Sequence, residues 1–247
     1  MISKIEKILA GLKTVSKDRK FISNVSSGGR SLASFQLNLA IKNYCSNFKT
    51  ILDVGANKGQ FAFAASQIFP EADIYSFEPV PDVYQTLKRN TKKMTKIQTF
   101  NKALGAEIGK IKFYKNKYSH ASSALPIHDN QKKLIPGTSD VEEIEVEVST
   151  LNDFLAGIDV VSPSLLKLDV QGYEKEVIKG ASNVFDKIDY ILFETSFIEM
   201  YQGEPLFDEM HEFVKEKGFK ILAPVGFLQT DNLQIPQMDI LYKRDNV

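Results

Sequence analysis

Apolar segments suited to buried strands alternate along this chain with amphipathic helical segments, and this alternation restricts the fold more than any other feature. Strands are expected at 50–56, 73–79, 97–105, 165–172 and 190–197, and helices at 60–69, 81–92, 173–185 and 205–217. Near-continuous apolar strands separated by such helices are typical of an α/β domain whose mostly parallel sheet is covered on both faces. Two final strands, 219–227 and 238–244, are joined by a loop, which predicts an antiparallel pair at one edge.

Two segments depart from this alternation. Residues 110–116 and 142–151 alternate with period two around a polar loop at 118–140. We interpret them as an inserted β-hairpin whose long loop is either functional or disordered. At the other end, Ile2, Ile5 and Ile8 begin an apolar stripe that predicts an amphipathic helix. With a flexible joint at 26–30 and a second helix at about 31–45, it divides the chain into an N-terminal helical segment, 1–49, and a main domain, 50–247.

The amino-acid composition limits which binding partners and which cellular compartment are expected. The 31 basic and 31 acidic residues balance, whereas nucleic-acid binding usually brings a basic excess. The single cysteine, Cys45, cannot form an internal disulfide, which fits a reducing compartment. No apolar run is long enough to span a bilayer and no signal peptide is evident, so we expect a cytoplasmic protein. The first helix is expected to pack on the main domain or on a partner subunit in a homo-oligomer. Its flanking lysines leave peripheral membrane contact as the alternative.

Polar residues follow the predicted strands at the points where each strand ends. They are Asp53 with the turn Gly55–Ala56–Asn57–Lys58–Gly59, then Glu78, Asn101, Asp169 with Gln171, and Glu194. Because ligands of open parallel sheets bind outside the carboxyl ends of the strands, these residues predict one binding site on one rim.

The turn after the first strand indicates the kind of ligand. It lacks the glycine pattern of a phosphate-binding loop or of a dinucleotide fingerprint. Asp53 would repel a pyrophosphate but suits a cation, and Glu78, about 20 residues after the glycines, can hold both ribose hydroxyls. A positively charged nucleoside without phosphate, such as S-adenosylmethionine, fits these features. The alternatives are an ordinary strand-to-helix turn for the glycines and helix caps for the two acids.

Four motifs carry a family resemblance. "DVGANKGQF" covers 53–61, "FEP" covers 77–79, "NKALG" covers 101–105 and "KLDVQGYEKEVIKGA" covers 167–181. With them the chain resembles the FkbM family of S-adenosylmethionine-dependent methyltransferases, over about 50–242. The resemblance implies a Rossmann-like, doubly wound sheet of seven mostly parallel strands with a reversed strand at one edge. At position 171 the family usually has Glu, so Gln171 removes one candidate carboxylate.

The resemblance also implies which residues contact the cofactor. Candidates are Asp53, Gly55, Ala56, Asn57, Gly59, Phe61, Glu78, Pro79, Asn101, Ala103, Asp169 and Gln171. Family members are commonly O-methyltransferases that act on sugars or secondary metabolites, so the expected partner is a small-molecule or glycan acceptor.

Methylation of an alcohol calls for a group that accepts its proton. Asp169 is the first candidate base, with helix capping as its alternative role. Glu194 ends the adjacent strand, so these two carboxylates could share Mg²⁺, although a third ligand is not evident and a metal is not favoured. His120, in the inserted loop, could fold over the rim as the base or lie on the surface without a role. Lys167 is expected to pair with an acid.

Three other functions are alternatives to this prediction. A nicotinamide-dependent oxidoreductase would need a different glycine pattern. The sequence lacks the motifs expected of a nucleic-acid methyltransferase. A non-catalytic protein that keeps the fold and binds S-adenosylmethionine is the main rival, and the loop at 118–140 is expected to shape the acceptor site in an enzyme.

Overall fold

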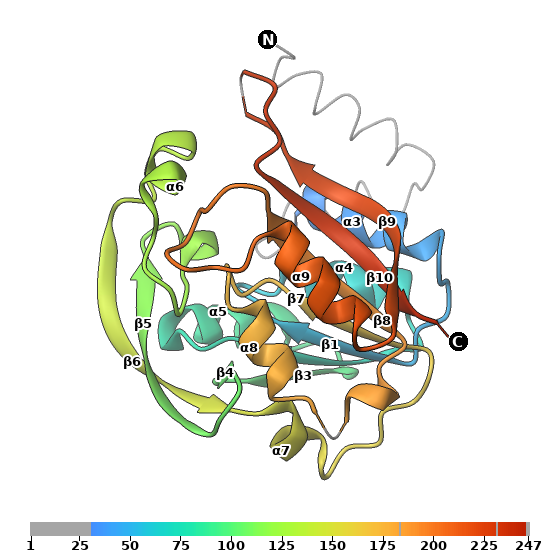
Figure 1. Cartoon of the computed structure of the whole chain (residues 1–247). Coiled ribbons are helices and arrows are strands. Elements are labelled where there is room, and N and C mark those ends of the chain that lie inside the picture. Colours follow the sequence, from blue (N-terminus) through green and yellow to red (C-terminus); the bar gives the residue numbers. More distant parts are fainter. Residues whose placement is uncertain (1–30, 183, 231, 246–247) are drawn as a thin grey trace.

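The computed structural model describes residues 31–182, 184–230 and 232–245 (Figure 1). The predicted first helix and the joint at 26–30 lie outside the described residues. The elements are α3 (Leu32–Lys42), β1 (Thr50–Val54), α4 (Gln60–Ile68), β2 (Asp73–Phe77), α5 (Pro81–Thr91), β3 (Ile97–Phe100), β4 (Ala103–Leu104), β5 (Gly109–Asn116), η1 (Ser119–Ala121), α6 (Asp129–Leu134), β6 (Val141–Ser149), α7 (Leu151–Leu155), β7 (Ser164–Leu168), α8 (Glu174–Lys179), η2 (Phe185–Lys187), β8 (Tyr190–Ser196), α9 (Phe207–Lys215), β9 (Phe219–Leu228) and β10 (Gln237–Arg244).

The central sheet has seven strands in the order β3-β2-β1-β7-β8-β10-β9. From β3 to β8 every neighbouring pair is parallel, and β10 runs antiparallel to both β8 and β9. This confirms the predicted Rossmann-like, doubly wound and mostly parallel sheet with a reversed strand toward one edge. The reversed strand is β10, and β9 lies outside it.

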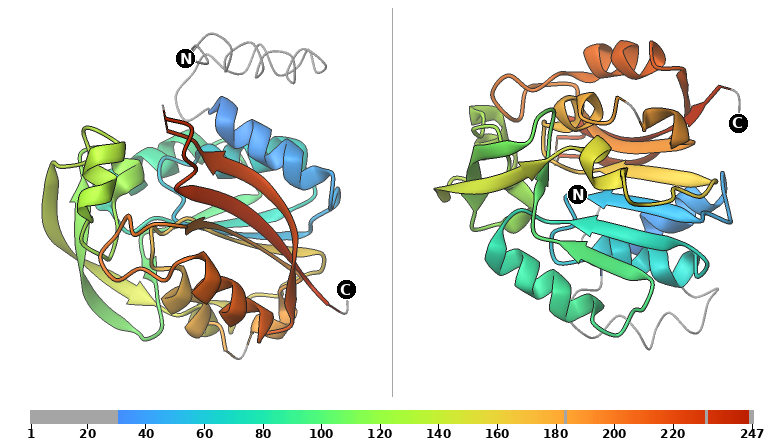
Figure 2. Two further views of the ribbon diagram at one scale, coloured as in Figure 1. Left: turned by 45° about the horizontal axis from the view of Figure 1, so that its top comes forward. Right: turned by 90° about the horizontal axis from the view of Figure 1, so that it is seen from below.

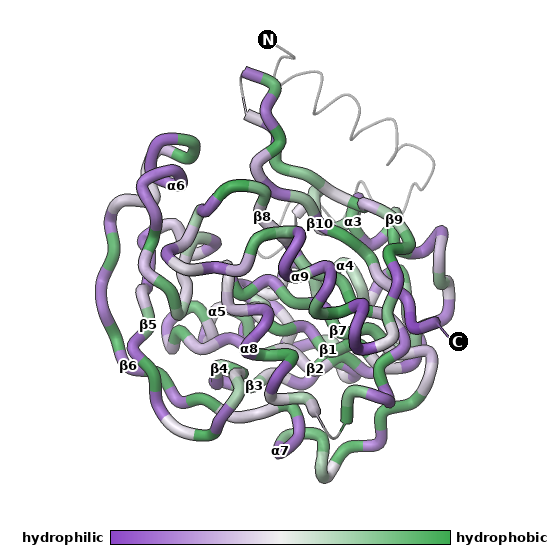
Figure 3. Tube along the Cα trace, in the orientation of Figure 1, coloured by the Kyte–Doolittle hydropathy of each residue, from purple (hydrophilic) through white to green (hydrophobic). Residues whose placement is uncertain are grey.

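Helices cover both faces of this sheet (Figure 2). One apolar cluster packs the sheet against α7, α8 and α9, and a second packs it against α3 and α4. The tube coloured by hydropathy shows apolar segments concentrated in the strands (Figure 3). Ile41 of α3 is fully buried in the second cluster, so α3 shares the core of the main domain.

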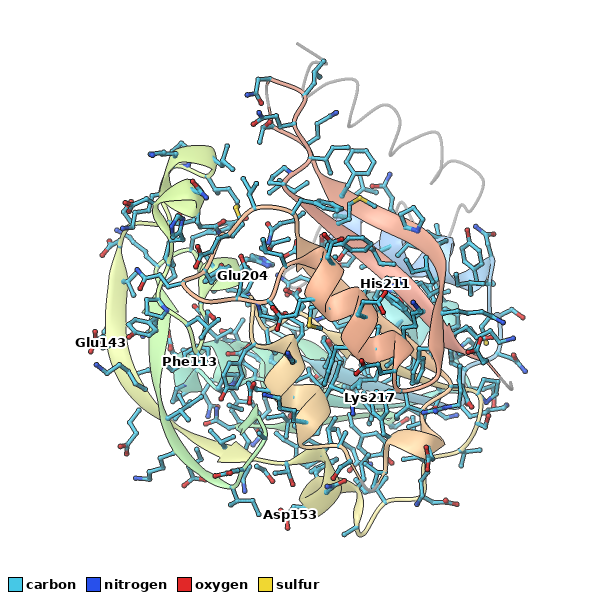
Figure 4. All side chains as sticks on the ribbon, in the orientation of Figure 1. Phe113, Glu143, Asp153, Glu204, His211 and Lys217 are labelled. Carbon is cyan, nitrogen blue, oxygen red and sulfur yellow. The ribbon has the colours of Figure 1, made fainter. Side chains whose placement is uncertain are left out.

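The inserted hairpin is present. Its strands β5 and β6 pair antiparallel over their whole length, and β4 adds a third, short strand. Phe113 lies on the side of the hairpin that packs against α5, whereas Glu143 lies on its outer side (Figure 4). The loop between the two strands, residues 117–140, contains η1 and α6 and is called the bridging segment below.

Two predicted elements end earlier than expected. The strand predicted at 97–105 stops at Phe100, because the Asn101 side chain donates hydrogen bonds to the carbonyls of Glu78 and Pro79 and the chain then turns into the second sheet. The helix predicted at 173–185 stops before Gly180, which passes so close to Gly105 that an added Cβ would lie 2.0 Å from its carbonyl oxygen.

Candidate active site

The conformation of the turn after β1 explains why it contains two glycines. Gly55 has a φ of +78°, and a Cβ added there would lie 1.9 Å from the carbonyl oxygen of Asp169. Gly59 has a φ of +87°, and an added Cβ would lie 2.8 Å from Leu87 Cδ1. Only glycine permits both the left-handed backbone and these close approaches. The end of β1 can therefore turn directly against the end of β7.

Glu78 connects the turn after β1 with the turn after β2. Its Oε2 accepts a hydrogen bond from the Asn57 N–H and its Oε1 accepts one from the Val80 N–H, each at 2.9 Å. The residue is only 6% exposed. Burial raises the pKa of its carboxyl to about 7, although the two N–H donors favour the charged form. Glu78 is thus a fixed carboxylate at the cleft described below.

Asp53 lies behind this cleft and not at its surface. Its side chain is fully buried, its Oδ1 lies 2.9 Å from Lys167 Nζ, and Ser76 Oγ donates to its Oδ2. Lys167 also donates to the Gly55 carbonyl at 3.0 Å and lies 3.6 Å from Asp169 Oδ2. Burial opposes the charge of Lys167, but the attraction of Asp53 and Asp169 outweighs it and raises its pKa. The prediction that Lys167 pairs with an acid is confirmed.

The bridging segment crosses the strand ends from the turn at 55–59, called the cofactor turn below after the role predicted for it, to the loop after β8. Near its start, Ser119 Oγ donates to Asn57 Oδ1 at 3.1 Å. Farther along, Ser123 Oγ donates to the carbonyl of Gln171, and Ile127 pairs with Tyr201. The segment is therefore attached at three points and forms a wall over the rim.

His120 stands within this wall, beside η1. Its Nε2 lies 3.3 Å from Gln60 Nε2, and burial lowers the pKa of its imidazole. An imidazole held neutral can accept a proton near neutral pH. His120 therefore lines the cleft at the rim, although the residue remains exposed to solvent.

Asp169, Gln171 and Glu194 form a hydrogen-bonded group at the ends of β7 and β8. The Gln171 amide nitrogen donates to Asp169 Oδ1 at 2.7 Å and to Glu194 Oε2 at 3.2 Å. The side chain of Asp169 remains 41% exposed. Burial, and after it the nearby Asp239, raises the pKa of Glu194 well above its usual range. The helix after β7 begins without a side-chain cap, so helix capping does not explain Asp169.

These elements line a cleft that is partly open to solvent. Its lining includes eight predicted site residues, Gly55, Asn57, Glu78, Pro79, Ala103, His120, Asp169 and Gln171. The other predicted residues, Asp53, Ala56, Gly59, Phe61, Asn101 and Glu194, do not line it. Ala56 and Phe61 are buried behind the turn, and Asn101 holds the turn after β2 in place.

Several other lining residues were not among the candidate site residues, although Tyr173 lies at the start of a helix predicted to begin at the rim. They are Val54, Phe77, Lys102, Leu104, Ile111, Phe113, Ser119, Ser122, Ala124, Val170 and Tyr173. Ile111 and Phe113 lie two residues apart on one face of β5, so the period-two pattern marks them as a pair. The pattern does not say that this face closes over the rim.

The described residues contain no candidate metal centre and no membrane span. Among residues 31–182, 184–230 and 232–245, no group of three or more His, Cys, Asp or Glu side chains is arranged to hold a metal ion. Within the same ranges no helix is both long enough and apolar enough to cross a bilayer.

The cleft fits a nucleoside cofactor that carries no phosphate. One end presents the Glu78 carboxylate, which suits ribose hydroxyls, beside apolar side chains such as Leu104 and Phe113, which suit a purine ring. The other end presents Asp169. This arrangement and the sheet order define an S-adenosylmethionine-dependent methyltransferase.

Comparison with known proteins identifies the family. The family model described as the methyltransferase FkbM domain matches residues 53–221. The chain belongs to this family.

Curated relatives agree with that assignment. The chain is 26% identical over 184 residues to methyltransferase 1 of Beauveria bassiana, covering 69% of this chain and 72% of the relative. It is 27% identical to the 2-O-methyltransferase NoeI of Sinorhizobium fredii, covering 62% and 66% of the two chains. It is 25% identical to the hexuronic acid methyltransferase AglP of Haloferax volcanii, covering 58% and 54%. Among solved structures, magnesium protoporphyrin IX methyltransferase of Synechocystis aligns with a TM-score of 0.48 at 9% identity, covering 94% and 95%.

Proposed function

We propose that this methyltransferase acts on a hydroxyl group of a sugar or of a hydroxylated metabolite. The observation that carries the proposal is that Glu78 and Asp169, which follow the two strands on either side of β1, line one cleft. The relatives named a 2-O-methyltransferase and a hexuronic acid methyltransferase support oxygen as the acceptor atom and a sugar as the acceptor class.

The cofactor would be held at the Glu78 end of the cleft. We assign the ribose hydroxyls to Glu78 and the purine to the apolar wall formed by Leu104, Ile111 and Phe113. Gly55 and Asn57 would line the path toward Asp169. When bound, S-adenosylmethionine supplies an electrophilic methyl group. Asp53 would act indirectly, because its carboxylate is paired with Lys167, which in turn holds the Gly55 carbonyl.

Asp169 is the proposed general base. Its carboxylate is partly exposed at the cleft, and its Oδ2 faces the Lys167 ammonium. A base placed in this way can take the hydroxyl proton as the oxygen attacks. His120 is the second candidate, because it lines the same cleft and its lowered pKa keeps it able to accept a proton.

Glu194 is a weaker candidate for direct chemistry, and a Mg²⁺ shared with Asp169 is not needed in this proposal. The Gln171 amide nitrogen lies between the two carboxylates and donates to both. These two hydrogen bonds hold the acid groups together without a cation.

The test is transfer of a labelled methyl group to a panel of neutral methyl pyranosides, uronic acid glycosides and hydroxylated macrolides. We expect the wild type to label at least one hydroxyl compound. D169N should lower the rate by about 10²-fold or more, within the range of general-base catalysis, while calorimetry shows a much smaller change in cofactor affinity. A larger loss in H120Q than in D169N would make His120 the base. Tight cofactor binding without transfer to any compound in the panel would favour the non-catalytic rival and contradict the proposal.

A further inference from the structure

The Gln171 side chain makes three hydrogen bonds at the rim. Each of its two amide N–H groups has a carboxylate within reach, Asp169 Oδ1 at 2.7 Å and Glu194 Oε2 at 3.2 Å. Its side-chain oxygen accepts the hydroxyl of Tyr201 at 2.7 Å. Since a carboxylate accepts and a phenol donates, these partners determine which end of the amide faces the acids.

Tyr201 is a fixed anchor for this amide. It is fully buried, and burial followed by the nearby Glu194 raises the pKa of its phenol well above the usual value, so the hydroxyl keeps its proton. Gln131 Nε2 lies 3.4 Å from the same hydroxyl as a donor, which leaves the hydroxyl hydrogen free for Gln171. Hydrogen bonds are therefore donated in one direction, from the Tyr201 hydroxyl to the Gln171 oxygen and from the Gln171 nitrogen to the two acids.

The backbone at this position also holds the side chain in place. Gln171 has a φ of +57°, which is uncommon for a residue other than glycine. Its carbonyl accepts a hydrogen bond from Ser123 Oγ at 2.7 Å. Such backbone conformations persist where the surrounding contacts enforce them. Both the main chain and the side chain of Gln171 are thus attached to loops outside β7.

We propose that Gln171 is a positioning residue, whose amide holds Asp169 and Glu194 at a fixed separation and keeps Asp169 aimed at the acceptor. This inference rests on the proposed role of Asp169 as the base. In this proposal Gln171 holds the two acids, whereas the family resemblance implies that it contacts the cofactor. A base held in one geometry contributes to rate through alignment and not through binding.

The chain supplies a matched control. Gln237 is buried and its Nε2 also donates to Glu194 Oε2, at 3.1 Å, and to Ser196 Oγ. Its amide makes no hydrogen bond to Asp169. Q171L and Q237L therefore each remove one amide donor to Glu194, and only Q171L removes the donor to Asp169.

The first experiment compares the two variants kinetically, using whichever pyranoside or macrolide accepts label from the wild type. We expect Q171L to lower kcat roughly 10- to 100-fold, in the range expected for a misplaced reacting group, with little change in the KM of either substrate. Q237L should stay within about threefold of the wild type, since alignment of the base is untouched. Y201F, which removes the hydroxyl that donates to Gln171 and accepts from Gln131, should lie between them. Equal losses in Q171L and Q237L would overturn the proposal, as would a loss confined to KM.

The second experiment needs no acceptor. Crystal structures of the two variants should show the Asp169 carboxylate moved or in several conformers in Q171L, and unmoved in Q237L. An unmoved Asp169 in Q171L would overturn the proposal. If Q171L does not fold, the Y201F structure takes its place, with the same expected displacement and the same contradicting result. If the wild type labels no acceptor, the proposed function fails while these structures still decide whether Gln171 holds Asp169.

Discussion

Asp53 and Lys167 occupy paired positions on the neighbouring strands β1 and β7, and their charged atoms lie 2.9 Å apart with both side chains buried. Lys167 also reaches the Gly55 carbonyl and Asp169. One ammonium thus connects a buried acid, the cofactor turn and the candidate base. A change in this pair should therefore affect both the stability of the sheet and the geometry of the cleft.

Removing the lysine should therefore destabilise the fold strongly. K167M leaves the Asp53 charge buried without its partner, and we expect a loss of about 3–5 kcal/mol in the free energy of unfolding. The control is K215M, which removes an ion pair with Glu212 in which both side chains are about 60% exposed. Pairs of that kind contribute below about 1 kcal/mol. Urea denaturation of both variants measures the difference, and similar midpoints would contradict the account of the buried pair.

Adding one methyl group at the cofactor turn should disrupt the cleft. In G55A the new Cβ would collide with the Asp169 carbonyl, so the ends of β1 and β7 must separate. We expect a loss of cofactor binding by calorimetry and a clearly lower melting temperature. G137A is the control, because Gly137 also has a positive φ but has no atom within 4 Å of an added Cβ. It carries only the backbone penalty, about 1–2 kcal/mol, and should bind the cofactor as the wild type does.

Cofactor affinity should depend on pH through Glu78. Burial raises the pKa of its carboxyl to about 7, and only the ionised form accepts hydrogen bonds from both ribose hydroxyls. The carboxyl is mostly ionised above pH 8 and about a tenth ionised at pH 6, so affinity should fall about tenfold on acidification between these values. Calorimetric titration across this range checks the slope. E78Q should bind weakly with no such slope in this range, and an equal slope in E78Q would assign the effect to another group.

The wall of the inserted hairpin should contribute to cofactor binding as well as to stability. Phe113 is 8% exposed and packs beside the cleft, so F113A should cost about 3 kcal/mol of stability and lower cofactor affinity. E143A removes a side chain from the outer face of the same hairpin, where it pairs with Lys112. It should leave the affinity unchanged. Affinities of the two folded variants that agree within error would show that the hairpin does not form part of the cofactor site.

The site residues at the strand ends were predictable because the carboxyl ends of parallel strands lie at the same edge of a sheet. Gly55, Glu78 and Asp169 each follow a predicted strand, and all three line the cleft. Their convergence requires only the strand order, which the alternation of strands and helices and the family motifs predict.

The rest depends on contacts between distant segments. Asp53 has the residue type of a ligand for a cationic cofactor, but the register of β1 on β7 places Lys167 beside it. Similarly, the close approach of Gly180 to Gly105, where the helix after β7 ends, joins two segments that lie 75 residues apart in sequence. Local periodicity carries no information about such pairings, so sequence alone does not reveal them.

The bridging segment spans the distance from Asn57, at the cofactor turn, to Tyr201, beyond the end of β8. Under the proposed function, substitutions within it should change which alcohols are accepted while the seven strands of the central sheet remain as they are. Enzymes with new acceptor preferences could therefore be sought by exchanging this stretch alone, a modular route to altered specificity that leaves the folding core intact.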